Sequence, residues 1–265
     1  MKHPNRSKLH LVLRSFMVLC VAGILVSAYV LFSDSQEYAS GDAAYQELRH
    51  LRGSADPDPG STNQSPGEES AKKDPPFLGI NFMALERINP DVVGWLTAEG
   101  TELDYPVVQG TDNDFYLWHL FDGEPNKLGS LFMDYRNSED FSDKNTVIYG
   151  HNMKDGSMFA SLAKYKDQRY YESFPTMRIS IPAGDFVIEL FAGTVVDGDY
   201  ESVRFDFKDN EDFQRYADSL KKNSTFESNT IVTAEDRIIT FATCSYEFNN
   251  ARYALYGKLT PEGND

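Results

Sequence analysis

The pattern of apolar and polar positions predicts one long apolar helix, a polar connection and then a folded domain. Residues 15–32 are uncharged and mostly apolar, which is just long enough for a helix that spans a bilayer. Residues 37–51 are compatible with a short helix next to it. Residues 54–76 are rich in Pro, Gly, Ser and charge and hold almost no apolar residue, so 33–76 is predicted to be a juxtamembrane segment and flexible linker. The folded domain is expected to cover residues 77–265.

Within this domain short strands dominate. Phe82, Leu85 and Ile88 have near-helical spacing, and Asn89-Pro90 should end that helix. A second helix is predicted for 211–222, where apolar residues recur at i, i+3, i+4 and i+7, and a weaker one for 157–165. Turn residues separate the predicted strands, which cover 104–109, 129–133, 146–149, 177–181, 186–195, 237–243 and 252–259. Many short strands with few helices favour a mostly-β barrel or sandwich.

The charge of the chain narrows its possible partners. The formal net charge is −16 at pH 7, and the first 32 residues contain four basic residues and no acidic one. The remainder is therefore more acidic than the whole, and such a surface repels nucleic acid. No EF-hand spacing of acidic residues and no cluster of Cys and His ligands is present, so the sequence predicts no metal site.

The N-terminal segment has two interpretations. The basic flank in residues 1–14 predicts a cytoplasmic N-terminus, with the rest of the chain outside. Alternatively, Val26-Ser27-Ala28 resembles the cleavage site of a signal peptide. The length of the apolar stretch favours an uncleaved, single-pass anchor in the cell membrane.

Cys244 is the first candidate for chemistry. The chain has two cysteines, and the other, Cys20, lies in the apolar stretch. A lone thiol in an exported domain has no disulfide partner and is open to oxidation, so its presence suggests that its reactivity is used. Acyl chemistry on a thiol also needs a proton-transfer group and a donor for the developing oxyanion.

Few residues can serve these two roles. His151 directly follows a predicted β-branched strand that ends in Gly150, whereas His119 lies in an aromatic segment better suited to packing, and His50 precedes the linker. Arg252 begins the strand after Cys244, and the short segment between them could form a hairpin that makes the two residues neighbours. Taken alone, each histidine and this arginine fit a structural role better than a catalytic one.

Together these residues resemble a known family. Residues 240–244 (Thr-Phe-Ala-Thr-Cys) are similar to the Thr-Leu-x-Thr-Cys signature of sortases, the cysteine transpeptidases of Gram-positive cell surfaces. Residues 129–137 and 145–153, together with 93–96 and 104–110, resemble class B sortases in particular. Phe241 replaces the usual Leu, a change that a core-facing position should tolerate.

The resemblance implies a fold and a set of roles. The fold would be a closed β-barrel of about eight strands with N-terminal helices and one helix inserted between late strands. Cys244 would be the nucleophile, His151 the general acid and base, and Arg252 the oxyanion-stabilising or substrate-orienting cation. The residues that match peptide-binding positions of class B enzymes are Asn113, Leu117, Tyr149, Tyr200 and Thr243.

The resemblance also implies substrates. Surface proteins with a C-terminal signal of the Asn-Pro-x-Thr type would be cleaved after Thr through a thioester, and an amine of a peptidoglycan precursor or a pilin would accept the product. No cofactor would be required. Two alternatives remain: a cysteine peptidase that hydrolyses similar peptides, and a non-catalytic membrane-tethered β-domain in which Cys244 is a core residue.

Overall fold

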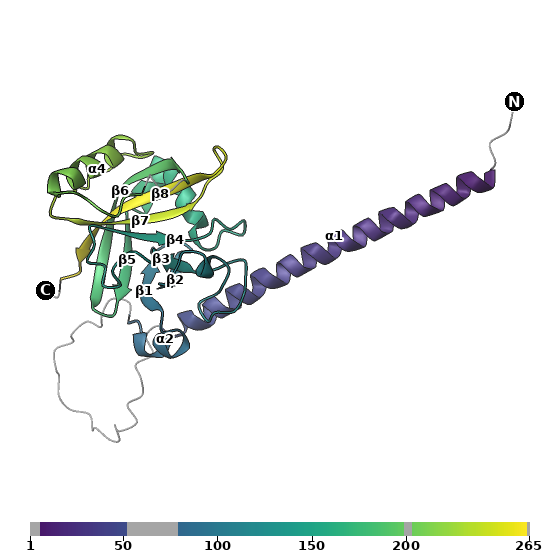
Figure 1. The fold of residues 1–265 in the computed structure, drawn as a ribbon, viewed down its shortest axis with the longest axis horizontal. Coiled ribbons are helices and arrows are strands. Elements are labelled where there is room, and N and C mark those ends of the chain that lie inside the picture. The colour runs from purple at the N-terminus through teal and green to yellow at the C-terminus, as the bar shows by residue number, and fades with distance from the viewer. Residues whose placement is uncertain (1–5, 52–78, 199–202, 264–265) are drawn as a thin grey trace, which may run out of the picture. The chain divides into compact units, whose positions relative to one another are not determined.

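The computed structural model describes residues 6–51, 79–198 and 203–263, in two compact units, Met1–Ala43 and Ala44–Asp265. Helix α1 (Arg6–Arg49) is continuous, so the helix predicted for 37–51 belongs largely to it (Figure 1). Among the described residues it is the one helix long and apolar enough to cross a membrane, with a mean hydropathy of 2.4 over 18 residues. This is consistent with membrane anchoring.

The end of α1 belongs to the second unit. Tyr45 and Leu48 are buried there, and the Tyr45 hydroxyl donates a hydrogen bond to the Gly129 carbonyl, with 2.6 Å between the oxygens. The predicted domain boundary at Phe77 lies outside the described residues and stays a prediction.

The second unit is a closed eight-stranded barrel with the strand order β1-β2-β3-β4-β7-β8-β6-β5 (Figure 1). This confirms the expected barrel of about eight strands. The β2–β3 and β4–β7 pairs are parallel, and the other neighbours are antiparallel. The strands are β1 (Val92–Thr97), β2 (Asp104–Val108), β3 (Leu131–Met133), β4 (Asn145–Tyr149), β5 (Thr176–Ile181), β6 (Gly184–Asp197), β7 (Arg237–Cys244) and β8 (Ala251–Pro261).

Strand β1 was not among the strands predicted from the sequence. All six of its residues are buried, so it shows no alternation of apolar and polar positions. Alternation marks only a strand with one solvated face, and a short buried run cannot be assigned from its periodicity.

The shorter helices lie in the connections between strands. Helix α2 begins after Asn81, whose side chain accepts a hydrogen bond from Ala84 N, and ends at Asn89 as predicted. The weak helix predicted for 157–165 is a 3₁₀ helix. The elements are α2 (Phe82–Ile88), η1 (Phe115–Leu117), η2 (Phe159–Lys166), α3 (Gln168–Ser173) and α4 (Asn210–Lys222).

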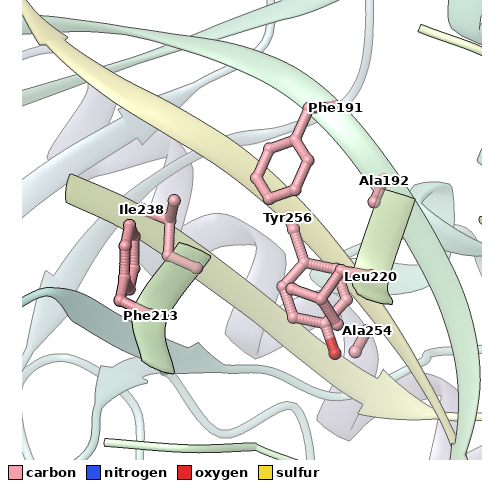
Figure 2. Close-up of a cluster of buried hydrophobic side chains, with 7 residues drawn as sticks. All are labelled: Phe191, Ala192, Phe213, Leu220, Ile238, Ala254 and Tyr256. Atoms are coloured by element: carbon pink, nitrogen blue, oxygen red, sulfur yellow. The ribbon is translucent and has the colours of Figure 1, made fainter. Parts of the chain in front are cut away.

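Helix α4 lies between β6 and β7 in the chain, as expected for the inserted helix. Asp209 caps its N-terminus by accepting a hydrogen bond from Asp212 N at 2.8 Å. Figure 2 shows how its apolar face meets the barrel: Phe213 and Leu220 pack with Phe191, Ile238 and Tyr256. Phe213 is fully buried, and loss of such a ring typically costs about 3–5 kcal/mol.

Strand pairing brings the functional candidates to one end of the barrel. In the parallel pair, Tyr149 of β4 is opposite Ala242 of β7, so the residues that follow both strands leave the sheet at the same edge. Strand β8 starts at this edge, where Arg252 is opposite Cys244. The site therefore forms where two strands end and a third begins.

Candidate active site

Cys244 is the last residue of β7 and is half-buried, with a free thiol. Its backbone carbonyl accepts a hydrogen bond from the side-chain amide of Asn152, with Nδ2 and O 2.9 Å apart. The next residue begins the loop to β8, and Ser245 N donates to Ala251 O at 2.8 Å to close it. The predicted hairpin between β7 and β8 is thus present. Phe241 is fully buried, as expected for a core-facing residue.

His151 follows β4 and is half-buried on the same edge. Its Nε2 lies 2.7 Å from the carbonyl oxygen of Leu117. Because a carbonyl oxygen can only accept, Nε2 carries a proton in this contact, which leaves Nδ1 as the basic nitrogen of a neutral ring. The ring also lies against the Trp118 ring, with centroids 5.6 Å apart.

Gly150 allows the chain to reach this position. A Cβ atom at residue 150 would lie 2.4 Å from Leu131 Cδ2 and 2.8 Å from the Phe159 ring. The Gly150 carbonyl accepts a hydrogen bond from the Thr243 hydroxyl at 2.7 Å, which joins the ends of β4 and β7. Because Thr243 is 2% exposed, water cannot readily replace this hydrogen bond. The bond therefore stabilises the backbone next to His151.

Arg252 supplies a cation at the same edge. Its Cα is paired with those of Cys244 on one side and Val196 on the other. The Arg252 guanidinium donates a hydrogen bond to the backbone carbonyl of the preceding residue, Ala251, with 3.2 Å between Nη1 and O. Within residues 79–198 and 203–263, no carboxylate forms an ion pair with it, so its charge is available to the site.

One cavity of about 310 Å³ unites these groups. Seven of the eight site residues predicted from the sequence line it: Asn113, Leu117, Tyr149, His151, Thr243, Cys244 and Arg252. The eighth, Tyr200, lies outside the described residues. A larger cavity of about 580 Å³ lies between Thr97 and Arg178, but its lining contains no thiol or imidazole, so it cannot support the same chemistry.

The sequence did not reveal two polar residues that organise the site. The side chain of Asn152 donates a hydrogen bond to the backbone carbonyl of Cys244, which is 92 positions away along the chain. Asp134 follows β3 and accepts hydrogen bonds from Asn113 and Tyr149, two residues of the cavity wall. Both contacts depend on which strands pair, and the sequence does not show this pairing directly. For Asn152, the one available signal was its position next to His151.

The site shows no arrangement that suggests a metal. In the described part of the chain, no three His, Cys, Asp or Glu residues are grouped closely enough to hold an ion. The chemistry available is that of a thiol, an imidazole and a guanidinium around one cavity, which fits nucleophilic acyl transfer.

Comparison with known proteins supports this assignment. The sortase domain model matches residues 96–260. A sortase B of Listeria monocytogenes is 44% identical over 177 residues, which are 66% of this chain and 72% of that protein.

Solved structures agree. A Staphylococcus aureus sortase B–substrate complex has a TM-score of 0.66 and 35% identity over 69% of this chain and 85% of its own. A sortase B complexed with triglycine has a TM-score of 0.65 and 34% identity, over 69% and 86%. The chain therefore belongs to the sortases, the cysteine transpeptidases of the cell surface, and within that family it is a class B sortase.

Proposed function

We propose that this sortase cleaves a C-terminal signal of the Asn-Pro-x-Thr type after Thr and transfers the exported protein to an amine. The single observation that supports this most strongly is the shared cavity of Cys244, His151 and Arg252. The three residues come from the ends of β4, β7 and β8, so the barrel, and not a flexible loop, sets their spacing.

In the proposed mechanism, the Cys244 thiolate attacks the Thr carbonyl of the signal. The Arg252 guanidinium stabilises the oxyanion that develops on this carbonyl; one such donor typically contributes about 100- to 1000-fold in rate. His151, as the imidazolium that holds the proton taken from the Cys244 thiol, protonates the departing amine, and a thioester forms. His151 then removes a proton from the incoming amine, which attacks the thioester and releases Cys244.

The remaining lining residues are proposed to hold the peptide. Asn113, Leu117, Tyr149 and Thr243 line the cavity beside the three reactive groups, and Tyr200 is proposed on the resemblance alone. The similar structures with bound substrate and with triglycine support a signal-bearing peptide and an amine acceptor as the two substrates. The acceptor here would be an amine of a peptidoglycan precursor or a pilin.

Residues 15–32 of α1 are proposed to be the uncleaved membrane anchor. The helix is apolar and continuous there, and the basic residues before it favour a cytoplasmic N-terminus. The domain of residues 77–265 would then act outside the cell, joined to the anchor by the 33–76 segment.

Mass spectrometry of the full chain in detergent tests the proposal. An Asn-Pro-Gln-Thr-Asn peptide should form an acyl adduct on Cys244, and triglycine should yield a ligated product; both should be absent in Cys244→Ala. Hydrolysis of the peptide without transfer to any of the amines supplied would instead indicate a cysteine peptidase. A folded protein with an inert thiol and no adduct from a panel of sorting peptides would leave a non-catalytic tethered domain.

A further inference from the structure

Asp134 is a buried carboxylate that the mechanism above does not use. It directly follows β3, and its side chain is 0% exposed. Its Oδ1 accepts hydrogen bonds from Arg136 N at 3.0 Å and Arg136 Nε at 2.8 Å. Its Oδ2 accepts from Arg136 Nη2 and Asn113 Nδ2, each at 2.8 Å, and from the Tyr149 hydroxyl at 3.0 Å.

The carboxylate is held in its ionised form. Burial raises the pKa of Asp134, but hydrogen bonds from Arg136, Asn113 and Tyr149 outweigh this effect and hold the pKa below its ordinary value. The Arg136 guanidinium is itself fixed, since it stacks over the Phe205 ring with 3.9 Å between Cζ and the ring centroid. A buried charge that is paired and fully bonded is both costly to disturb and specific in geometry.

An ionised carboxylate accepts but does not donate, so every partner must turn a donor toward it. This settles the orientation of the Asn113 amide, whose Nδ2 faces Asp134 while its Oδ1 accepts from Tyr135 N at 3.2 Å. It also turns the Tyr149 hydroxyl proton toward Asp134 Oδ2.

This orientation matters because Asn113 and Tyr149 line the cavity, whereas Asp134 does not. A carboxamide has two N–H donors and two acceptor lone pairs, and two of these four are used by Asp134 and Tyr135. The remaining donor and acceptor of Asn113 are not used by any described residue, and they form a pair that complements a carboxamide or a peptide group of a ligand.

We propose that Asp134 is a positioning residue that sets the hydrogen-bonding polarity of the Asn113 and Tyr149 wall, so that this wall recognises amide groups of the sorting peptide. The inference rests on the proposed function. Asp134 contacts none of Cys244, His151 and Arg252, so its effect should fall on peptide binding and not on the thiol.

The test compares two isosteric variants of the full chain in detergent. In Asp134→Asn the neutral amide has one acceptor oxygen, which cannot serve both Arg136 and the pair Asn113 and Tyr149. Asp143→Asn is the matched control: Asp143 lies in the same β3–β4 connection and accepts from Asn137 Nδ2 at 2.8 Å and Ser138 N at 2.7 Å, but it does not line the cavity.

We expect Asp134→Asn to raise KM for an Asn-Pro-Gln-Thr-Asn peptide about 10-fold with kcat within about twofold, as for lost binding that is equal in ground and transition states. The rate of Cys244 alkylation by iodoacetamide should match that of the wild type. Replacing the first Asn of the peptide by Ala should raise KM for the wild type and for Asp143→Asn. The same replacement should change KM little for Asp134→Asn.

Three results would overturn the inference: equal KM in the two variants, a loss confined to kcat, or slowed alkylation in Asp134→Asn alone. If Asp134→Asn does not fold, Asn113→Ala decides, because an unchanged KM in that variant excludes amide recognition by this wall. A wild type that forms no acyl adduct would overturn the proposed function itself, whereas an active wild type with indifferent variants would overturn this inference alone.

Discussion

The side-chain amide of Asn152 donates a hydrogen bond to the backbone carbonyl of Cys244, with 2.9 Å between Nδ2 and O. Asn152 is the residue after His151, so this contact ties the segment that carries the imidazole to the backbone of Cys244. It acts together with the hydrogen bond from Thr243 to Gly150 O, and the two bonds join β4 and β7 beyond the point where strand pairing ends.

Removal of the Asn152 contact should therefore loosen the alignment of thiol and imidazole. We expect Asn152→Ala to lower kcat/KM about 10- to 100-fold, since a shift of about 1 Å in a reacting group can cost 100-fold. Asn223→Ala is the control, because Asn223 Nδ2 also donates to a backbone carbonyl at 2.9 Å, but at the end of α4. Steady-state transpeptidation that is equally affected in both variants would argue against this role of Asn152.

A methyl group at residue 150 should displace His151. The Cβ of Gly150→Ala would come within 2.4 Å of Leu131 and 2.8 Å of Phe159, both in the packed interior. We expect lower thermal stability and loss of most of the transpeptidase activity. Gly263→Ala, where a Cβ meets nothing within 4 Å, should behave as the wild type in the same melting and activity assays. A Gly150→Ala protein with wild-type activity would mean that the side chains of Leu131 and Phe159 can move to accommodate the methyl group.

Thr146 offers a stabilising change. The residue is fully buried on β4, and its hydroxyl has no hydrogen-bond partner among the described residues. Thr146→Val should raise the free energy of unfolding by about 1 kcal/mol, because a buried hydroxyl without a partner carries a desolvation cost.

Thr240 on the neighbouring β7 is the matched contrast. It is equally buried, but its hydroxyl donates to Asn145 Oδ1 at 2.8 Å, so Thr240→Val should destabilise by about 1–3 kcal/mol. Chemical denaturation of both variants measures the difference, and effects of the same sign would refute the argument.

The loop between Cys244 and Arg252 should contribute a pH-dependent part of the stability. Hydrogen bonds from Lys166 and Ser245 lower the pKa of Glu247 to about 2, from an ordinary value of 4.5. Because the folded pKa lies below the unfolded one, the stabilisation is fully present above about pH 4.5 and is lost as the pH falls toward 2.

Glu247→Gln should accordingly lower the melting temperature near neutral pH, and the gap to the wild type should narrow as the pH falls from about 4.5 toward 2. Glu139→Gln, at an exposed carboxylate outside this loop, should leave the melting temperature nearly unchanged over the same series. Melting curves measured from pH 7 to pH 3 are sufficient, and a gap that widens on acidification would contradict a lowered pKa in the folded state.

The parts of the site that were predictable from the sequence depend on local spacing. Cys244 and Arg252 flank one short loop, and a hairpin makes such residues neighbours whatever the rest of the fold does. The approach of His151 to Cys244 depends on parallel pairing of β4 with β7, which no local pattern encodes; only the family resemblance implied it.

The same distinction explains the elements that were missed. Helix α4 has a clear apolar stripe and was predicted within a residue of its bounds, whereas β1 is buried on both faces and has no periodic signal. Asp134 is not recognisable as important in the chain, because an aspartate after a strand is common in loops, and its significance comes from partners 15 and 21 positions away.

The strand order has a consequence for biogenesis. Strand β7 fits between β4 and β8, so the barrel closes only when the last two strands are present, and these are the strands that bear Cys244 and Arg252. During synthesis from the N-terminus, His151 precedes Cys244 by more than ninety residues. A chain that ends before residue 244 therefore carries the imidazole without the Cys244 thiol. The site is therefore complete only when β7 and β8 have both joined the barrel, so closure of the barrel and assembly of the reactive groups require the same two strands.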